Sequence, residues 1–479
     1  MKVNMKRPTW KAYTAAGVVA LIVVFALIWH NGRPASKDIT NNDGNGSEQL
    51  NQASDLDKEA AKLGAIAVPT YPEKTNYYDS LILKDQQSQS LDKNFLSAMQ
   101  TFSWTSADKI LTQNSSGANQ LYSPISLYMA LALTADGAQA STQKEIINAL
   151  AMADLDITQM NEQTHQLFNN LYFDNEIGRL KFANSLWLSK QVGFNKAFLQ
   201  KAAQDHYAFS YSVDFGAEET GNKINQWIAD NTGGKLGTGQ SRLTVDPESV
   251  MNLINTTYFY DEWKKEFPAQ ETKEDQFYLS DGSTVSSPFM NTKIRDYYVK
   301  GKGYSAAKLD LKNGESMVFI LPDKGRSPYD LLENSTQFSE TVSALVSGQG
   351  QYGEVAFKVP KFKFYSNMED LQEVLKEMGI QRVFQHDGAD FGNFSAFKPL
   401  YISKVMQWAY ISIEEKGCEA AAYTVEMAQG GGDGEQKVDT FEMILDRPFL
   451  FVITKNSGLS SESSFAQVPL FIGVVNNPI

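Results

Sequence analysis

The sequence has 479 residues, of which 42% are hydrophobic and 21% are charged, and its formal net charge at pH 7 is −13. This composition is that of a globular protein and excludes a wholly disordered, collagen-like or polytopic membrane protein. Because an acidic surface repels phosphate backbones, we expect no nucleic-acid partner.

The N-terminus carries either a membrane anchor or a cleaved signal peptide. Tyr13 to Trp29 contain no charge, and four basic residues precede them: Lys2, Lys6, Arg7 and Lys11. The positive side stays inside the cell, so the rest of the chain is expected on the extracellular or periplasmic side. The apolar run is at the short end of a bilayer-spanning helix, and the residues after Trp29 form a poor cleavage site. We therefore favour an uncleaved anchor in residues 1–30, with cleavage left open.

A polar tether is predicted next, over residues 31–90. Residues 30–70 contain no Phe, Tyr or Trp and are rich in Asn, Asp, Gly, Ser and Gln. Such a stretch buries too little apolar surface to offset the entropy lost on ordering, so it should be flexible. A short helix between Asp57 and Ala67 is left open. The folded domain is placed at 91–479.

The folded domain mixes helical and strand patterns. Apolar spacing predicts helices near residues 95–102, 125–135, 222–231 and 371–378. Strand-like runs occupy residues 250–260, 316–321, 354–364, 401–414 and 448–453. The strands outnumber what a simple β-α-β alternation provides, so the fold class is predicted to be α+β.

Few residue patterns of enzyme chemistry occur in the chain. Cys418 is the only cysteine, so no internal disulfide and no cysteine-based zinc site can form. The four histidines form no paired metal-ligand motif, and no nucleophile elbow, Walker A loop or dinucleotide fingerprint occurs. We therefore expect neither a metal nor a cofactor.

One long segment, residues 417–438, suits no compact element. It begins GCEAAAYTVEMA and continues QGGGDGEQKV, which is a glycine-rich loop. Long exposed loops of this kind are typically functional or disordered. If the first part became a strand, Cys418, Ala420, Ala422 and Thr424 would share one face, and all four are small and uncharged. An alanine-rich helical fragment is the alternative.

Several ordered motifs make the chain similar to the serpin family from about residue 95 to the end. They are Asn119, Ser123, Pro124 and Ser126; Asn255, Tyr258, Phe259, Trp263 and Phe267; Pro360, Lys361 and Phe362; Glu415, Gly417, Glu419, Ala420, Ala421 and Ala422; and Pro448, Phe449, Phe471, Gly473 and Pro478. Each motif alone is weak, whereas their order and spacing together are specific.

The resemblance implies a serpin fold with three β-sheets, about nine helices and an exposed reactive-centre loop near residues 415–440. It implies a suicide-substrate inhibitor of serine, and in some cases cysteine, endopeptidases, which traps the acyl-enzyme when the cleaved loop inserts into the central sheet. Such a protein is not an enzyme, and a bacterial-type, membrane-anchored or exported monomer is expected. The alternative is a non-inhibitory serpin that acts as a binding or chaperone-like surface protein.

The resemblance also assigns roles to individual residues. The hinge of the loop comprises Glu415, Gly417, Cys418, Ala420, Ala421, Ala422 and Thr424, and the region that gates sheet opening comprises Asn119, Ser123, Pro124, Ser126, Asn255, Trp263 and Gln407. The family's spacing puts the cleaved bond sixteen residues after Glu415, at Gly431–Gly432. Met427–Ala428 and Lys437–Val438 are the rival bonds.

Two of these positions depart from the family pattern. Cys418 stands where Thr or Ser is usual, and Gln407 replaces a histidine beside Asn255. Cysteine is close in size to threonine, and glutamine can still donate and accept hydrogen bonds. An exposed hinge thiol would also be open to oxidation, which predicts a redox switch at Cys418. The alternative is that Cys418 only fills the space of a threonine.

Overall fold

A computed structural model describes residues 55–80, 91–113, 117–368, 370–418, 439–455 and 468–479, all within one unit, Ser54–Ile479. Its helices are α2 (Asp55–Leu63), α4 (Lys93–Gln113), α5 (Pro124–Gly137), α6 (Ala140–Ala149), α7 (Ile157–Leu171), α8 (Lys196–Asp205), α9 (Glu218–Asn231), α10 (Tyr329–Leu332), α11 (Ser335–Val346) and α12 (Gln372–Glu377). The α+β class predicted from the sequence is confirmed.

The strands form two hydrogen-bonded sheets, which we call sheet A and sheet B. Sheet A contains β1 (Ala65–Ala67), β5 (Ala208–Val213), β4 (Arg179–Ser189), β6 (Met251–Glu262), β14 (Gly417–Cys418), β13 (Met406–Ile413) and β12 (Phe362–Met368) in that order, and β3 (Phe173–Asp174) pairs with β4. Sheet B contains β15 (Thr440–Ile444), β11 (Gln351–Pro360), β8 (Thr284–Gly301), β9 (Tyr304–Asp310), β10 (Glu315–Pro322), β16 (Phe449–Lys455), β17 (Val468–Val475) and β2 (Gln120–Tyr122), and β7 (Lys273–Tyr278) pairs with β8.

The third sheet expected from the resemblance is continuous with sheet B. Strand β8 is long enough to pair first with β7, then with β11 and finally with β9. The two regions are thereby joined through one backbone ladder. The strand predicted over 354–364 is also divided, because the chain leaves sheet B at Pro360 and enters sheet A at Phe362. Likewise, the run at 401–414 becomes a strand only from Met406.

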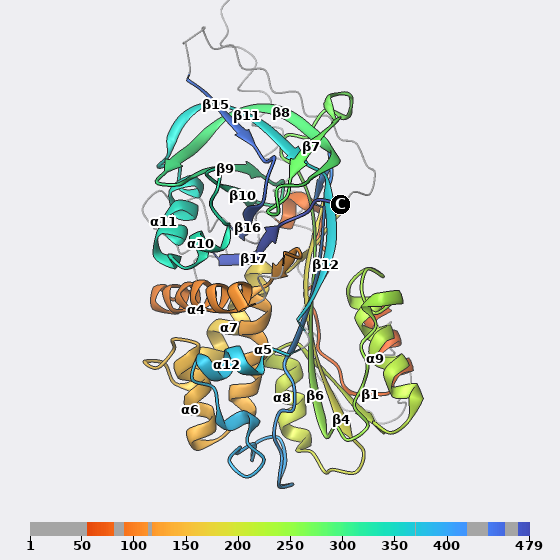
Figure 1. Cartoon of the computed structure of the whole chain (residues 1–479). Coiled ribbons are helices and arrows are strands. Elements are labelled where there is room, and N and C mark those ends of the chain that lie inside the picture. Colours follow the sequence, from red (N-terminus) through yellow and green to blue (C-terminus); the bar gives the residue numbers. More distant parts are fainter. Residues whose placement is uncertain (1–54, 81–90, 114–116, 369, 419–438, 456–467) are drawn as a thin grey trace, which may run out of the picture. The chain divides into compact units, whose positions relative to one another are not determined.

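Sheet A has helices on both sides. In Figure 1, α9 covers one face in the lower half of the view, and α5, α7 and α8 lie on the other side. The face under α9 has its own aromatic core, which includes Trp187, Tyr211, Trp227 and Trp408. The opposite face packs against helices and against sheet B. Opening of sheet A therefore has to be accommodated by packed side chains on both faces.

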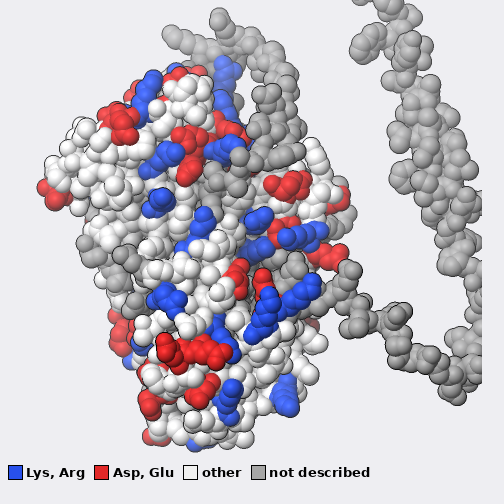
Figure 2. Space-filling model, turned by 90° about the vertical axis from the view of Figure 1, so that its right-hand side faces the viewer, with Lys and Arg blue, Asp and Glu red and all other residues white. Residues whose placement is uncertain are grey.

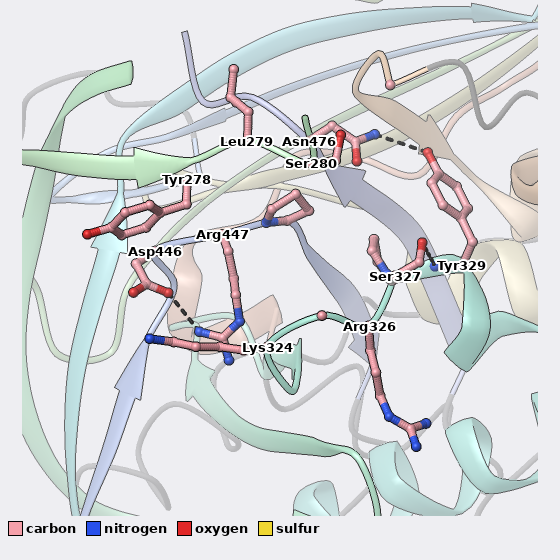
Figure 3. A pocket seen from close by; sticks show the side chains of 14 residues that line it. Tyr278, Leu279, Ser280, Lys324, Arg326, Ser327, Tyr329, Asp446, Arg447 and Asn476 are labelled. Carbon is pink, nitrogen blue, oxygen red and sulfur yellow. Dashed lines mark hydrogen bonds and ion pairs between the residues drawn. The ribbon is translucent and has the colours of Figure 1, made fainter. Parts of the chain in front are cut away.

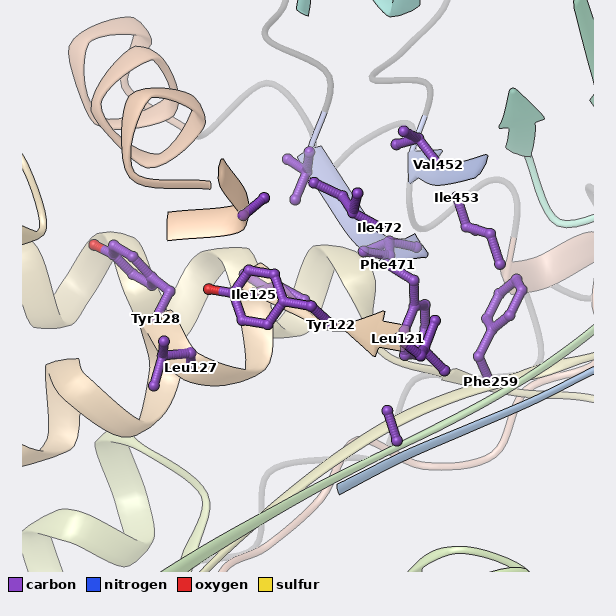
Figure 4. Close-up of a cluster of buried hydrophobic side chains, with 14 of the residues drawn as sticks. Leu121, Tyr122, Ile125, Leu127, Tyr128, Phe259, Val452, Ile453, Phe471 and Ile472 are labelled. Carbon is purple, nitrogen blue, oxygen red and sulfur yellow. The ribbon is translucent and has the colours of Figure 1, made fainter. Parts of the chain in front are cut away.

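The main core lies where sheet A meets sheet B and α5. Figure 4 shows Phe259 of β6 close to Phe471 of β17, and their ring centroids are 6.0 Å apart. Leu121 and Tyr122 of β2 and Ile125 of α5 belong to the same fully buried cluster. Helix α5 is buried along its whole length, which its nearly continuous apolar sequence requires.

Residues 55–80 pack on the folded unit, which corrects part of the predicted tether. Helix α2 and strand β1 form here, and β1 extends sheet A by pairing with β5. The Tyr71 hydroxyl donates to the carbonyl oxygen of Phe182 at 3.0 Å, and its ring contacts Phe168 and Tyr172. The boundary at residue 91 is therefore too late in the chain. Composition missed this because the aromatic-free stretch ends at residue 70, and Tyr71, Tyr77 and Tyr78 follow it. A few such residues suffice when a partner surface exists.

The predicted membrane segment, residues 13–29, lies outside the described residues. Among the helices that the structure describes, none combines the length and the apolar character that crossing a bilayer requires. Figure 2 shows acidic and basic side chains interspersed over the visible face, with no large area of one sign.

Candidate functional site

The hinge of the long loop is already part of sheet A. Strand β14 lies between β6 and β13: Cys418 pairs with Asp261 on one side and with Ile413 on the other. Below this point β6 and β13 pair directly with each other, from Ile254 to Thr256 on β6. Strand β14 thus separates β6 from β13 at the Cys418 end of sheet A, which we call the open upper part. Near Ile254 the two strands pair directly, and we call this the closed lower part.

Gly417 can occupy this position because it has no side chain. A Cβ atom there would lie 2.2 Å from the carbonyl oxygen of Asp261 and 2.7 Å from the Cα atom of Glu262. Both contacts are with backbone atoms, which cannot rotate away. The close approach of the hinge to β6 therefore requires glycine.

A turn and a tryptophan fix the chain just before Gly417. Glu414 and Gly417 exchange backbone hydrogen bonds of 3.0 and 3.2 Å. The Trp263 backbone N–H donates to the Lys416 carbonyl oxygen at 2.8 Å, and its indole N–H donates to the Glu414 carbonyl oxygen at 2.9 Å. Trp263 is fully buried. The structure thus brings Trp263, which the resemblance assigned to the region that gates sheet opening, into contact with the hinge.

Glu415 forms the ion pair of the hinge. Its carboxylate accepts a hydrogen bond from Lys361 Nζ at 2.9 Å and another from Thr272 Oγ1 at 2.9 Å. Burial alone would raise the pKa of Glu415, but the bonds from Lys361 and Thr272 outweigh it and hold that pKa below its ordinary value. The pair ties the hinge to the point where the chain passes from β11 to β12.

Replacing Lys361 with methionine should lower the free energy of unfolding by roughly 1 kcal/mol at pH 7, because a partly exposed pair is worth about that much. A group with a lowered pKa stabilises the fold above its unfolded pKa and loses that effect as the pH falls. The variant and the parent should therefore converge below about pH 4. Urea titrations at pH 7 and below about pH 4 measure the free energy of unfolding of the variant and the parent. Lys363→Met, at an exposed position of β12, is the control, and an equal loss in both variants would contradict the assignment.

Cys418 is buried, which corrects the expectation of an exposed thiol. Its side chain is 1% exposed, and burial, followed by the proximity of Asp261, raises the pKa of the thiol. Oxidants react with the exposed thiolate form of cysteine, so the docked hinge protects Cys418. The premise of the predicted redox switch is wrong for this conformation. The inward position predicted for Cys418 is confirmed.

The C-terminal stem of the loop is anchored in sheet B. Strand β15 pairs in parallel with β11 from Thr440 to Ile444. Arg447 then donates two bonds to the Pro322 carbonyl oxygen, at 3.1 and 2.8 Å, and one to Asp446 at 2.7 Å. Figure 3 shows Asp446 and Arg447 at one side of a pocket of about 920 Å³ and Tyr329 at the other. Because Arg447 and Asp446 are hydrogen-bonded within the protein, this side of the pocket serves to hold the C-terminal stem of the loop.

Two sets of hydrogen bonds connect β6 and β13 to the start of α5. The backbone N–H of Ser123 donates to Gln407 Oε1 and Gln407 Nε2 donates to the Ser123 carbonyl oxygen, each at 2.8 Å. The Ser126 hydroxyl donates to Asn255 Oδ1. Asn255 and Gln407 are also register partners across β6 and β13. Gln407 therefore provides a polar network at the closed part of the sheet despite replacing a histidine.

This polar network extends further than the sequence indicated. Asn255 Nδ2 donates to Asn184 Oδ1 at 2.6 Å, and Asn184 Nδ2 donates to the His206 carbonyl oxygen at 3.0 Å. The His206 ring lies 3.4 Å from Asp136. Burial acts to raise the Asp136 pKa, but the bonds from His206 and Lys201 prevail and lower it to about 2. No motif pointed to Asn184 or His206, since their contacts join distant parts of the chain.

Other predicted site residues lie elsewhere. Asn119 bonds to the C-terminal segment: its Oδ1 accepts from the backbone N–H groups of Asn476 and Asn477 at 2.7 and 2.9 Å. It is therefore not part of the cluster around Asn255, contrary to the prediction. Pro124 is the first residue of α5 and Ser123 caps that helix. The hinge residues 420–424 and the bond Gly431–Gly432 lie outside the described residues, and within the described ones no acidic, histidine or cysteine group suits a metal ion.

Comparisons with known proteins agree on one family. The sequence model described as Serpin (serine protease inhibitor) matches residues 97–478. A serine protease inhibitor of Mus musculus is 30% identical over 422 residues, which cover 86% of this chain and 96% of the relative. Its mammalian origin gives no support to the expectation of a bacterial-type member.

Solved structures agree as well. The thermophilic serpin tengpin in its native state has a TM-score of 0.70 and 27% identity, covering 87% of this chain and 98% of that one. Thyroxine-binding globulin, solved in complex with thyroxine, has a TM-score of 0.67 and 25% identity, covering 80% of this chain and 99% of that one.

Proposed function

The chain belongs to the serpin family, and from this premise we propose that it is a suicide-substrate inhibitor of serine endopeptidases, and in some cases of cysteine endopeptidases. The protease would attack the exposed loop and form an acyl-enzyme. Insertion of the cleaved loop into sheet A would then carry the protease away and trap it. The protease supplies the nucleophile, so the inhibitor itself performs no turnover.

The docked hinge is the observation that carries this proposal. Because Gly417 and Cys418 already form a strand between β6 and β13, a continuation of the same antiparallel register would set the position of each later residue of the inserted loop. Cys418 lies opposite Asp261 and Ile413. Ala420 would therefore fall between Phe259 and Ile411, and Ala422 would fall between Thr257 and Ala409. All four of these residues are buried, so small uncharged side chains are what insertion requires.

The same register shows where resistance to insertion begins. Residues 419–422 would occupy the open upper part of sheet A, where no pairing between β6 and β13 has to break. Tyr423 would fall between Thr256 and Trp408, which are paired with each other. Thr424 would come next, between Asn255 and Gln407, which the polar network also holds. Insertion beyond Ala422 thus has to separate β6 from β13 and disturb the packing under α9.

We place the attacked bond at Gly431–Gly432, within residues 429–432. Cleavage there would allow an inserted strand to run most of the length of sheet A at about 3.3 Å per residue. Cleavage after Met427 would shorten the strand by about 13 Å, and cleavage after Lys437 would add about 20 Å of slack. Glycine at the attacked position suits elastase-like or broad-specificity proteases and argues against trypsin.

Incubation with a panel of serine and cysteine proteases tests the proposal. An elastase-like protease should give an SDS-resistant band that contains both proteins, and mass spectrometry should find a released C-terminal fragment that starts within residues 430–432. Trypsin should cut after Lys437 and escape more often than it is trapped. A stable complex whose fragment starts at Val438 would overturn the assigned bond, and cleavage without any complex would overturn inhibition.

Thyroxine-binding globulin, which shares the fold, was solved with a bound small molecule, so a non-inhibitory binding role is the second candidate. A protein of that kind would be cleaved in the loop without forming a covalent complex. The docked hinge and the small residues after it favour inhibition. The complex-formation assay separates the two candidates directly.

The N-terminal region suggests where the protein acts. The basic cluster before Tyr13 and the apolar run to Trp29 support a protein held by a membrane anchor, or released by its cleavage, on the extracellular or periplasmic side. An inhibitor at that surface would protect the cell against external proteases. Fractionation followed by immunodetection of the intact N-terminus tests this, and recovery only from the cytoplasm would contradict it.

A further inference from the structure

Asp261 is a buried acid directly beside the docked hinge. It is the penultimate residue of β6, is 0% exposed and pairs with Cys418 of β14. Its carboxyl accepts three N–H bonds: from the Asn313 backbone at 3.0 Å, from Asn313 Nδ2 at 2.8 Å and from the Glu262 backbone at 2.9 Å. In the described part of the chain, no ammonium or guanidinium group lies within 4.0 Å of it. An ionised Asp261 would therefore be a buried charge without a counter-ion.

A second buried acid increases the cost of ionising Asp261. Glu315, at the start of β10, is 1% exposed; its Oε1 binds Lys455 Nζ at 2.6 Å, and its Oε2 has no hydrogen-bond partner among the described residues. The nearby Lys312 is already engaged by Glu262, at 2.6 Å. Of the two buried carboxyls, only Glu315 therefore has an ammonium partner. Burial first, and then the charge of Glu315, raise the pKa of Asp261 well above its ordinary value.

The groups that face this acid come from every neighbouring element. Glu315 approaches from sheet B with Lys455 bound to it, and Cys418 approaches from β14. The Tyr77 phenol approaches from the segment before α4, and its hydroxyl donates to the Lys312 carbonyl oxygen at 2.9 Å. The nearby cations are already paired, Lys455 with Glu315 and Lys312 with the buried Glu262. Ionisation of Asp261 thus leaves net negative charge in a site that the hinge closes to water.

The hinge excludes water from Asp261 only while it is docked. Gly417 lies against the backbone of Asp261 and Glu262 so tightly that no Cβ atom would fit. If Gly417 and Cys418 left sheet A, water would reach β6 at this point and could hydrate a carboxylate. The protonated acid therefore favours the docked hinge, and the ionised acid favours the released hinge.

We propose that Asp261 is a positioning residue for the hinge: while it holds its proton, Gly417 and Cys418 stay docked in sheet A, and when it ionises they are released. The proposal goes beyond the proposed function, because docking of the hinge is a property of the free protein and involves no protease. Docking would be strongest in mildly acidic solution and would weaken as the pH rises.

The chain contains its own reporter for this equilibrium. Cys418 is the only cysteine, and it is buried when the hinge is docked, so its reaction with 5,5′-dithiobis(2-nitrobenzoic acid) measures release. Rates would be taken from pH 5 to 8.5 on the intact protein. Dividing each rate by that of the urea-unfolded chain at the same pH removes the intrinsic ionisation of the thiol. The quotient should rise with pH, by up to about tenfold per pH unit over the range in which Asp261 ionises.

Two variants separate this effect from a general loosening of the fold. Asp261→Asn has nearly the same shape but cannot ionise, so its quotient should not change with pH. Glu315→Gln keeps Asp261 but removes the neighbouring charge, so the rise should move to lower pH. Circular dichroism would confirm that both variants fold, and Glu315→Gln alone suffices if Asp261→Asn does not. A flat quotient in the parent, or the same rise in Asp261→Asn, would overturn the proposal whatever the inhibition assay shows.

Discussion

Replacing Ala420 with arginine is expected to abolish complex formation and to leave a protein that proteases cleave and release. If the register of β14 continued, residue 420 would face inward between Phe259 and Ile411, which are 6% and 5% exposed. Phe259 also contacts Phe471 of sheet B, so no room for a guanidinium group is available there. A buried charge without a partner costs several kcal/mol. This cost should slow insertion so much that the acyl bond hydrolyses first and the protease is released.

The adjacent position provides a matched control for this experiment. Glu419→Arg introduces the same side chain one residue earlier, where the continued register would point it to the opposite face, beside the half-buried Tyr260 and the small Ser412. That variant should retain most of its complex-forming activity. The ratio of complex to cleaved product on SDS gels measures both variants against one elastase-like protease. Equal loss in both would mean that arginine disturbs the loop itself, and no loss in Ala420→Arg would mean that the hinge does not insert.

Cleavage of the loop should produce a large gain in thermal stability. An inserted strand would add roughly ten hydrogen bonds between β6 and β13, each worth about 1 kcal/mol net. A gain of that size corresponds to an increase in the melting temperature of at least about 15 °C. Differential scanning calorimetry before and after nicking within residues 425–437 measures it.

The variant Ala420→Arg also serves as the control for this measurement. After the same nick, its melting temperature should rise little, because the strand cannot enter sheet A. A parent protein whose melting temperature is unchanged or lower after cleavage would contradict insertion and would favour the non-inhibitory alternative. A large increase in both proteins would show that stabilisation comes from somewhere other than residue 420.

The sequence by itself determined the fold class and the family resemblance, and it assigned Cys418 to the inward face of the hinge. These depend on local and ordered patterns: the strand alternation, the helix spacing, and motifs such as that from Asn255 to Phe267. The side-chain period of a strand is two, so Cys418 and Ala420 could be assigned to one face from their spacing alone.

Only the tertiary structure decided the environment of these residues, because that environment is made by segments far apart in the chain. Cys418 is protected rather than exposed, since β6 and β13 close around it. Residues 55–80 are ordered, although the composition of residues 30–70 is that of a tether, because sheet A and the cluster around Tyr71 offer a surface to bury against. The acid cluster of Asp261, Glu315 and Lys455 likewise joins three strands from two sheets. Burial and charge pairing depend on distance in space, which local sequence patterns do not encode.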